Sequence, residues 1–429
     1  MRKKGVPGSP KSTSNAGFVV QINLTGLIVF SLALVAAAGL VTYGLVSRHS
    51  KAVANVPCPP VVDDASADSS TAAGSPAPWG ELVTSDIELE QPEEYVGFDS
   101  NTNQTPTWVF SSLAPDRVRA LLVWCGMSAD QADRFLVPEI VDATTSNTTV
   151  HPGENLILAM DPKVRAKLYA ELSHDPVNHF MRFPVCFPGR SFEERFGNNH
   201  LSPAIVELMR KLLYTRGDIQ CFSDLEIVQR HLSSEKERLQ WLKALSSQNA
   251  VLASVRIRPD TDIDKLLGYW ERGIQVKDVR PLLESIKRLP GGGTVNLLHL
   301  LPPFARDRLY TSPLPTKPGD PSLDCHWSTL NFFNETPDDR LADPKFASGY
   351  LSSNYYQVAK PSLYGDVILV LDEHGDAIHS GVYLADDIIF TKNGNNYAQP
   401  WKLMRLKDLT ALYALGNTPN LAIYRTRNW

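Results

Sequence analysis

One cysteine in the last third of the chain occupies a position where a nucleophile could form. Cys325 follows Asp324 at the predicted start of a helix. A thiol at a helix N-terminus lies at the positive end of the helix dipole, which lowers its pKa and favours the nucleophilic thiolate. A thiolate attacks electrophilic carbon atoms such as those of carbonyl groups. The alternative is a cysteine that is simply buried, as this residue type often is.

A histidine further along the chain could serve this thiol. The segments VILVLD, AIHSGVYLA and IIFTKNG, separated by turn residues, predict an antiparallel meander. His379 lies in the second strand and shares a face with Gly381 and Tyr383, because side chains alternate along a strand. The small Gly381 leaves space above the imidazole, as a substrate groove requires. His374 falls in the preceding turn, where we expect a solvated loop residue.

An ordered set of residues within 295–429 resembles the NlpC-type cell-wall cysteine peptidases. The set comprises Tyr310, the loop to Asp324-Cys325, the helix after it, Gly365-Asp366 and the strand His379-Ser-Gly-Val-Tyr-Leu. That family has a compact papain-like fold, in which a cysteine at a helix N-terminus packs against a sheet whose second strand presents a histidine. The resemblance implies Cys325 as nucleophile, His379 as general base and later acid, and Tyr310 near the oxyanion or substrate.

In that family the next strand normally supplies a third polar residue, which orients the imidazole. Direct spacing from His379 reaches Thr391, and Asn393 lies on the same face two residues later. An asparagine side-chain carbonyl accepts a hydrogen bond from an imidazole N–H. We therefore expect Asn393 to be the orienting residue, with Thr391 as the alternative, and Lys392 to point the other way.

The residues after the nucleophile depart from the family pattern. The usual D-C-S-G sequence is replaced by Asp324-Cys325-His326-Trp327, so that bulky residues stand where two small ones are usual. We expect His326 and Trp327 to lie beside the nucleophile and to narrow the substrate groove. Asp324 and Tyr310 are also expected to bind the substrate. His326 could also interact with the thiolate, or lie on the helix surface.

The N-terminal segment predicts a membrane anchor. The stretch Leu24–Val46 carries no charge and is almost purely apolar, so a helix of this length crosses the ~30 Å hydrocarbon core. The positive side chains before it are Arg2, Lys3, Lys4 and Lys11, and those soon after it are Arg48 and Lys51. The positive-inside rule then predicts a cytoplasmic tail at 1–17, a single anchor at 18–46 in the inner membrane and a periplasmic body. A cleaved signal peptide ending near Ala52-Val53-Ala54 is the competing interpretation.

Two segments separate the anchor from the C-terminal third. Residues 47–79, rich in Ala, Ser, Pro and Asp, predict a disordered linker, because they bury too little apolar surface to offset the entropy of ordering. Residues 80–294 predict a mostly helical domain of unknown role, with one strand possible at Val251–Ile257. The expected helices are Arg117–Leu136, Pro162–Leu172, Leu201–Gly217, Ser223–Leu232, Ser234–Leu245 and Val279–Leu289, with another at Val295–Leu301.

Composition and motifs argue against several classes of function. The chain has 429 residues and a net charge of -5, so no excess of positive charge is present to neutralise nucleic-acid phosphates. Its five cysteines contain no CxxC pair, which argues against a disulfide framework or a zinc ribbon. Asp260, Asp262, Asp264 and Glu271 have the spacing of a calcium-binding loop, but Lys265 replaces its glycine, so an acidic helix start is favoured. We expect no metal or organic cofactor.

The sequence therefore predicts an α+β chain with an N-terminal transmembrane helix, a mostly helical middle domain and a papain-like domain at 295–429, in which a helix packs on an antiparallel sheet. The resemblance implies a thiol hydrolase that cleaves peptide or amide bonds of peptidoglycan, or of another extracytoplasmic substrate. The alternatives are a catalytically inactive cell-wall-binding or scaffolding protein on the same fold, and an acyl or amide transferase.

Overall fold

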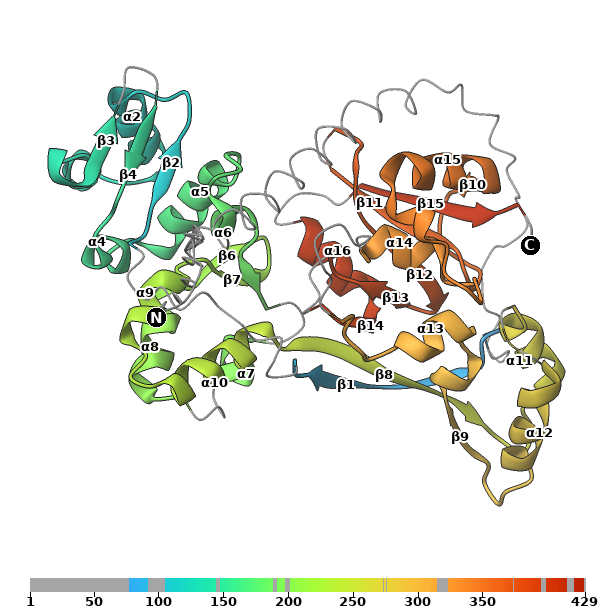
Figure 1. The fold of residues 1–429 in the computed structure, drawn as a ribbon. Coiled ribbons are helices and arrows are strands. Elements are labelled where there is room, and N and C mark those ends of the chain that lie inside the picture. The colour runs from blue at the N-terminus through green and yellow to red at the C-terminus, as the bar shows by residue number, and fades with distance from the viewer. Residues whose placement is uncertain are drawn as a thin grey trace, which may run out of the picture. The chain divides into compact units, whose positions relative to one another are not determined.

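The computed structural model of the chain describes residues 77–91, 105–143, 147–187, 191–196, 201–272, 274, 276–314, 323–372, 374–394, 399–414 and 420–427 (Figure 1). The predicted tail at 1–17, the predicted anchor at 18–46 and nearly all of the predicted linker at 47–79 lie outside these residues. None of the helices that the structure describes is both long and apolar enough to span a bilayer.

The described part of the chain belongs to the α+β class, which confirms that prediction. Residues 105–247 combine short helices with two small antiparallel sheets, of strand orders β2-β4-β3 and β5-β7-β6 (Figure 1). The elements of this segment are β2 (Trp108–Phe110), α2 (Pro115–Cys125), α3 (Ala129–Arg134), a 3-10 turn (Pro138–Ile140), β3 (Val141–Ala143), β4 (Thr148–Val150), α4 (Glu154–Leu158), α5 (Pro162–Leu172), α6 (His179–Arg182), β5 (Val185–Cys186), α7 (Phe192–Phe196), α8 (Pro203–Leu212), β6 (Tyr214–Arg216), β7 (Ile219–Phe222), α9 (Leu225–His231) and α10 (Glu235–Ser246).

A capping side chain and a glycine set the ends of two helices in this segment. α5 covers the predicted range Pro162–Leu172, and Asp161 caps it by accepting a hydrogen bond from the Lys163 N–H at 2.8 Å. The predicted helix Arg117–Leu136 is instead divided into α2 and α3, because Gly126 adopts a left-handed conformation, with φ of 114°, that ends α2.

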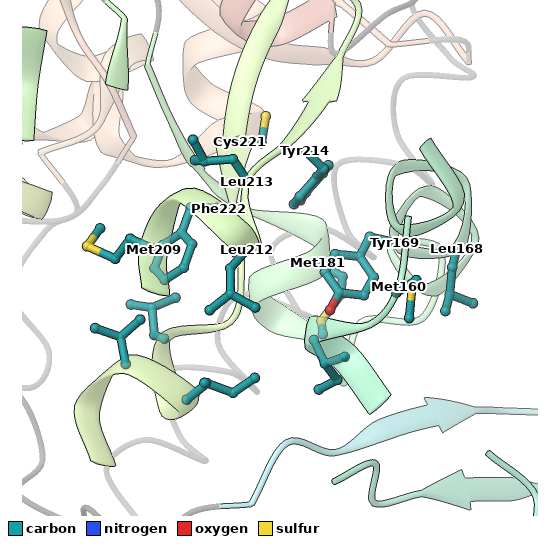
Figure 2. Close-up of a cluster of buried hydrophobic side chains, with 14 of the residues drawn as sticks. Met160, Leu168, Tyr169, Met181, Met209, Leu212, Leu213, Tyr214, Cys221 and Phe222 are labelled. Carbon is teal, nitrogen blue, oxygen red and sulfur yellow. The ribbon is translucent and has the colours of Figure 1, made fainter. Parts of the chain in front are cut away.

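The helix predicted to continue to Gly217 ends earlier. α8 stops at Leu212, because the next residue adopts extended backbone and Tyr214–Arg216 form β6. Gly217, with φ of 56°, turns the chain from β6 into β7. Figure 2 shows Met209 of α8 and Phe222 of β7 in the same buried cluster, which this arrangement completes.

A third small sheet joins distant parts of the sequence. β1 (Glu81–Leu89) pairs antiparallel with β8 (Gln248–Ile257), and β8 also pairs with β9 (Gly293–Asn296). Between β8 and β9 lie α11 (Ile263–Trp270), which Asp262 caps, and α12 (Val276–Lys287). The prediction of a helix at Val295–Leu301 is wrong. Val295 pairs with Val255 of β8, and only Leu297–Leu300 form a short 3-10 helix.

The C-terminal part contains the predicted meander, enlarged to a six-stranded sheet of order β10-β15-β11-β12-β13-β14. The three predicted strands correspond to β11, β12 and β13, and His379 of β12 lies opposite Val370 of β11. The elements are α13 (Pro303–Arg308), α14 (Cys325–Leu330), a 3-10 turn (Asp339–Ala342), α15 (Pro344–Asn354), β10 (Tyr355–Val358), β11 (Val367–Leu371), β12 (Ala377–Ala385), β13 (Ile388–Lys392), β14 (Trp401–Arg405), α16 (Leu406–Ala414) and β15 (Asn420–Thr426).

Strand alternation gives this sheet two apolar faces. Val382 and Phe390 belong to the larger buried cluster, to which α14 also contributes, and α14 packs on β12 and β13. Tyr383 and Ile389, the neighbours of these residues along the strands, belong instead to a smaller cluster that includes Leu409 of α16. Helices therefore cover both faces near the centre of the sheet.

Two large hydrophobic clusters divide the body. One contains buried side chains within Trp108–Leu245, and the other contains side chains within Val251–Leu403. Tyr269 of α11 also donates a hydrogen bond to the Leu384 carbonyl of β12 at 2.7 Å. The predicted domain boundary at 294/295 therefore falls inside the second cluster, and β8, α11 and α12 share a core with the C-terminal sheet.

Gly365 and Asp366, which precede β11, each have a structural reason for their identity. Gly365 has φ of 98°, and a Cβ atom there would lie 2.6 Å from the Phe333 ring. The Asp366 carboxylate is buried, accepts hydrogen bonds from two backbone N–H groups of the preceding turn, and pairs with Arg425 of β15 at 2.8 and 2.9 Å. This ion pair ties β15 to the start of β11.

Replacing Asp366 by Ala should lower the free energy of unfolding by about 3 kcal/mol, because it leaves two backbone N–H groups without an acceptor and Arg425 without its carboxylate, with Ser362 Oγ as a remaining neutral acceptor. Urea denaturation of the full-length chain measures the change. Glu207→Ala, which breaks an exposed ion pair with Arg210, is the control and should have no measurable effect. Equal losses in the two variants would contradict the role given to the buried pair.

Candidate active site

Cys325 is the first residue of the short helix α14. The Asp324 carboxylate caps this helix by accepting a hydrogen bond from the Trp327 N–H at 2.8 Å, and the Ser328 hydroxyl donates to the Asp324 carbonyl at 2.7 Å. The Trp401 indole N–H donates in turn to Ser328 Oγ at 2.8 Å, which fixes the helix start to β14. Cys325 itself is only 5% exposed.

Trp327 is part of the core. Its side chain is buried and packs against Phe304, with 5.3 Å between ring centroids. This burial corrects the prediction that Trp327 narrows a substrate groove. The turn of α14 carries the side chain inward two residues after Cys325, so its bulk serves packing.

A chain of hydrogen bonds across the sheet holds His379 of β12. Its Nε2 lies 2.8 Å from Thr391 Oγ1 of β13, and the Thr391 hydroxyl donates to the Ser380 carbonyl at 3.2 Å. Because the hydroxyl gives its one proton to that carbonyl, it can only accept from His379, which puts the imidazole proton on Nε2. The neutral imidazole then keeps its lone pair on Nδ1, a buried atom without a hydrogen-bond partner of ordinary length among the described residues.

Thr391 therefore makes the contact that we expected of Asn393. β13 ends at Lys392, so strand alternation no longer directs the Asn393 side chain towards His379. The Asn393 Oδ1 atom is buried and has no hydrogen-bond partner within the described part of the chain. Of Thr391 and Asn393, Thr391 is the residue that the structure places against the imidazole of His379.

Tyr413 of α16 completes the surroundings of the imidazole and was missed in the sequence. Its ring stacks on His379, with 4.2 Å between centroids and 17° between the ring planes. Burial, and then the charge of Cys325, raises the pKa of Tyr413, so its hydroxyl stays protonated. No motif spacing links Tyr413 to His379; only the packing of α16 on the sheet does.

His326 lies beside the thiol in space as well as in sequence. Burial alone would lower its pKa, but the Cys325 thiolate and the Asp324 carboxylate, with hydrogen bonds to Cys325 and the Ala377 backbone, raise it to about 9. Burial alone would raise the pKa of Cys325, yet the charges and hydrogen bonds of His326 and His379 hold it well below its usual range. At neutral pH the resting pair is therefore a thiolate beside an imidazolium.

Lys392 adds a second cation near the thiol. Its side chain is buried, and its ammonium donates to the Gly394 carbonyl at 2.8 Å. Burial lowers the pKa of Lys392 to about 8, while the negative charges of Cys325 and Asp324 act in the opposite direction. We expected Lys392 to point away from His379; its charge nevertheless interacts with the two anions at the start of α14.

Tyr310, expected near the oxyanion or substrate, serves the fold. Its backbone is left-handed, with φ of 62°, and its N–H donates to the Trp401 carbonyl at 2.7 Å. Its hydroxyl donates to the Val251 carbonyl of β8 at 2.5 Å. Among the described residues, no hydrogen bond or ring contact joins Tyr310 to Cys325 or His379.

Comparison with known proteins identifies no relative of this chain. No model of a known protein family matches the chain. No curated protein sequence and no solved structure matches it significantly either. In the parts of the chain that the structure describes, no group of three His, Cys, Asp or Glu side chains could hold a metal ion.

The rate at which iodoacetamide alkylates Cys325 should stay high below pH 8.5, the approximate pKa of a free thiol. A lowered pKa keeps the thiolate present as the pH falls. His326 and His379 both lower the pKa of Cys325 by their charge and hydrogen bonds. Replacing either residue by Ala should therefore move the midpoint of the pH–rate profile upward by about one unit. Mass spectrometry of the Cys325 peptide gives the rate. His374→Ala, in the exposed turn before β12, is the matched control and should leave the midpoint in place.

The same measurement separates the two candidate orienting residues. Thr391→Val keeps the shape of the side chain but removes the hydroxyl, so the imidazole loses the acceptor that fixes its proton on Nε2. We expect a midpoint between those of the parent chain and His379→Ala. Asn393→Ala should not move it. The reverse order of effects would return the orienting role to Asn393.

Proposed function

We propose that the chain is a thiol hydrolase in which Cys325 is the nucleophile and His379 is the general base. The observation that carries this proposal is the chain of hydrogen bonds from His379 through Thr391 to Ser380, which leaves Nδ1 with its lone pair. The lowered pKa of Cys325 supports the same roles, because the thiolate is the reactive form. Helix α14 packed on β12 and β13 fits a papain-like arrangement.

Before the substrate binds, Nδ1 of His379 takes the proton of Cys325, so that the resting thiolate attacks the carbonyl carbon of the substrate in the first half of the reaction. The backbone N–H of Cys325 donates to the resulting oxyanion. The imidazolium of His379 then protonates the leaving amine, and a thioester remains on Cys325. In the second half, His379 takes a proton from water, and the hydroxide releases the acid product and the Cys325 thiolate.

His326 has a separate part in this scheme. Its pKa of about 9 keeps it protonated at neutral pH, so it stabilises the thiolate both before attack and when the thiolate leaves. Because that charge is lost as the pH rises through about 9, the stabilisation is present below this value and absent above it. His379, not His326, carries the proton transfers, since Thr391 fixes its tautomer.

The proposed substrate is a peptide or amide bond of peptidoglycan, and the proposed location is outside the cytoplasm. The resemblance of residues 295–429 to NlpC-type peptidases supports the substrate. The uncharged stretch Leu24–Val46, with its excess of positive residues on the N-terminal side, supports a single anchor in the inner membrane.

A second candidate function is binding of cell-wall peptide, or of a partner, without cleavage. The observation that favours it is the restricted access to the thiol: Cys325 is 5% exposed, and Tyr413 covers one face of the His379 ring. A substrate carbonyl must reach a sulfur atom that the resting structure nearly encloses.

Incubation of the full-length chain with purified peptidoglycan separates the two candidates. We expect release of muropeptide fragments, detected by mass spectrometry, and at least a 1,000-fold lower rate for Cys325→Ala, on the order of the loss when a catalytic nucleophile is removed. Cys125→Ala, another buried cysteine outside the site, is the control and should retain the rate. Binding of peptidoglycan without release of fragments would favour the second candidate.

A reporter fused after Trp429 tests the location. If the tail at 1–17 is cytoplasmic and 18–46 crosses the membrane once, a reporter enzyme that is active only outside the cytoplasm should be active in this fusion. A second reporter that is active only in the cytoplasm should be silent at the same position. The opposite pair of results would remove the cell wall as the site of action.

A further inference from the structure

Cys186 and Cys221 form a close pair far from the candidate active site in sequence. Cys186 is in β5 and Cys221 in β7, and the two residues lie directly opposite each other in the antiparallel register. Their Sγ atoms are 3.4 Å apart, and both thiols are reduced. Neither residue has a part in the proposed hydrolysis.

The strand register places this pair where a disulfide fits without backbone movement. The Phe187 N–H donates to the Gln220 carbonyl at 3.0 Å, which makes these two residues a hydrogen-bonded pair of the ladder. The neighbouring pair, Cys186 and Cys221, is then a non-hydrogen-bonded one, whose Cα atoms are about 4.5 Å apart in a regular sheet. This separation lies within the range of roughly 4.4–6.8 Å that disulfides span.

The two thiols differ in access and in acidity. Cys186 is partly exposed, whereas Cys221 is fully buried in the cluster that holds Tyr214 and Phe222 (Figure 2). The hydrogen bond from Cys186 lowers the pKa of Cys221, and this effect outweighs that of burial. The same hydrogen bond, together with burial, raises the pKa of Cys186, so that the shared proton stays on Cys186. Cys186 is thus the thiol that a bulky reagent can reach, and Cys221 is the one poised as a thiolate behind it.

We propose that Cys186 and Cys221 are a redox site at which a disulfide closes between β5 and β7 by exchange with a disulfide oxidant. The Cys221 thiolate takes the proton of Cys186, whose sulfur atom attacks one sulfur of the oxidant. The second sulfur of the oxidant leaves as a thiolate and takes that proton from Cys221. The Cys221 thiolate then attacks the Cys186 sulfur of the mixed disulfide and releases the other half of the oxidant. Two cysteine thiols lose two protons and two electrons, and one oxidant disulfide becomes two thiols.

Closure of this bond cross-links two strands that are 35 residues apart in the chain. The segment between them contains α7, α8 and β6, so the bond restricts a long loop of the unfolded chain and stabilises the fold. Oxidants of the disulfide class are found in extracytoplasmic compartments, where disulfides persist. The pair is independent of Cys325, so the result for one site does not decide the other.

The test is oxidation of the full-length chain with glutathione disulfide, followed by blocking of free thiols and digestion with trypsin. The parent chain should give a linked peptide joining residues 183–190 to residues 217–230, and this peptide should disappear on reduction. Oxidation should also raise the Tm by on the order of 5–10 °C. Both measurements use the unmutated protein, so they do not depend on a variant that folds.

Variants identify the order of attack. Cys221→Ser should abolish the linked peptide and leave Cys186 as a mixed disulfide with glutathione, because the second thiol is missing. Cys125→Ser, another buried cysteine, should leave the linked peptide unchanged. The proposal is overturned if the parent chain gives no linked peptide, if Cys186 is linked to Cys125 or Cys325 instead, or if a linked chain has no higher Tm than the reduced one.

Discussion

The pairing of β12 with β13 is the contact on which both the core and the candidate site depend. Val382 lies opposite Phe390 in this pair, and both side chains belong to the buried cluster that α14 shares. The same two strands bring His379 to Thr391 at 2.8 Å. A register shift of one residue would turn the apolar side chains out of the core and move His379 away from its partner. Burial of apolar surface thereby fixes a hydrogen bond that is weak by itself.

The ionised groups around Cys325 stabilise one another, and none of them would keep its charge if it were buried alone. Cys325 and Asp324 are the anions, and His326 and Lys392 are the cations, in surroundings where an isolated ion would lose its charge. Each group has its ionised form favoured by the opposite charges beside it. Because Lys392 titrates at about 8 and His326 at about 9, this balance is complete only below those values. The two bulky residues after Cys325 thus differ in role: His326 carries a charge, and Trp327 fills the core.

How far the sequence could predict this structure depends on how local each feature is. β11, β12 and β13 follow one another with short turns, so alternation and turn residues were enough to predict them. Alternation alone does not locate the end of β13 at Lys392, so the sequence favours Asn393 over Thr391 as the partner of His379. The contact of Tyr413 with His379 depends on how α16 packs on the sheet. The pairing of β1 with β8 depends on a register between segments that are distant in the sequence. The Cys186–Cys221 pair likewise depends on contacts between distant segments, since no motif spacing links the two cysteines.

The candidate site is supported by more of the chain than residues 295–429. Trp401 holds the start of α14 through Ser328, and its carbonyl accepts a hydrogen bond from the Tyr310 N–H. The Tyr310 hydroxyl in turn donates to the Val251 carbonyl of β8, so the strand before the predicted boundary is joined to the helix that begins at Cys325. α11 is joined to β12, the strand of His379, by the hydrogen bond of Tyr269. Residues 248–294 are therefore part of the scaffold that holds Cys325 and His379 in position, and their buried apolar side chains belong to the same core.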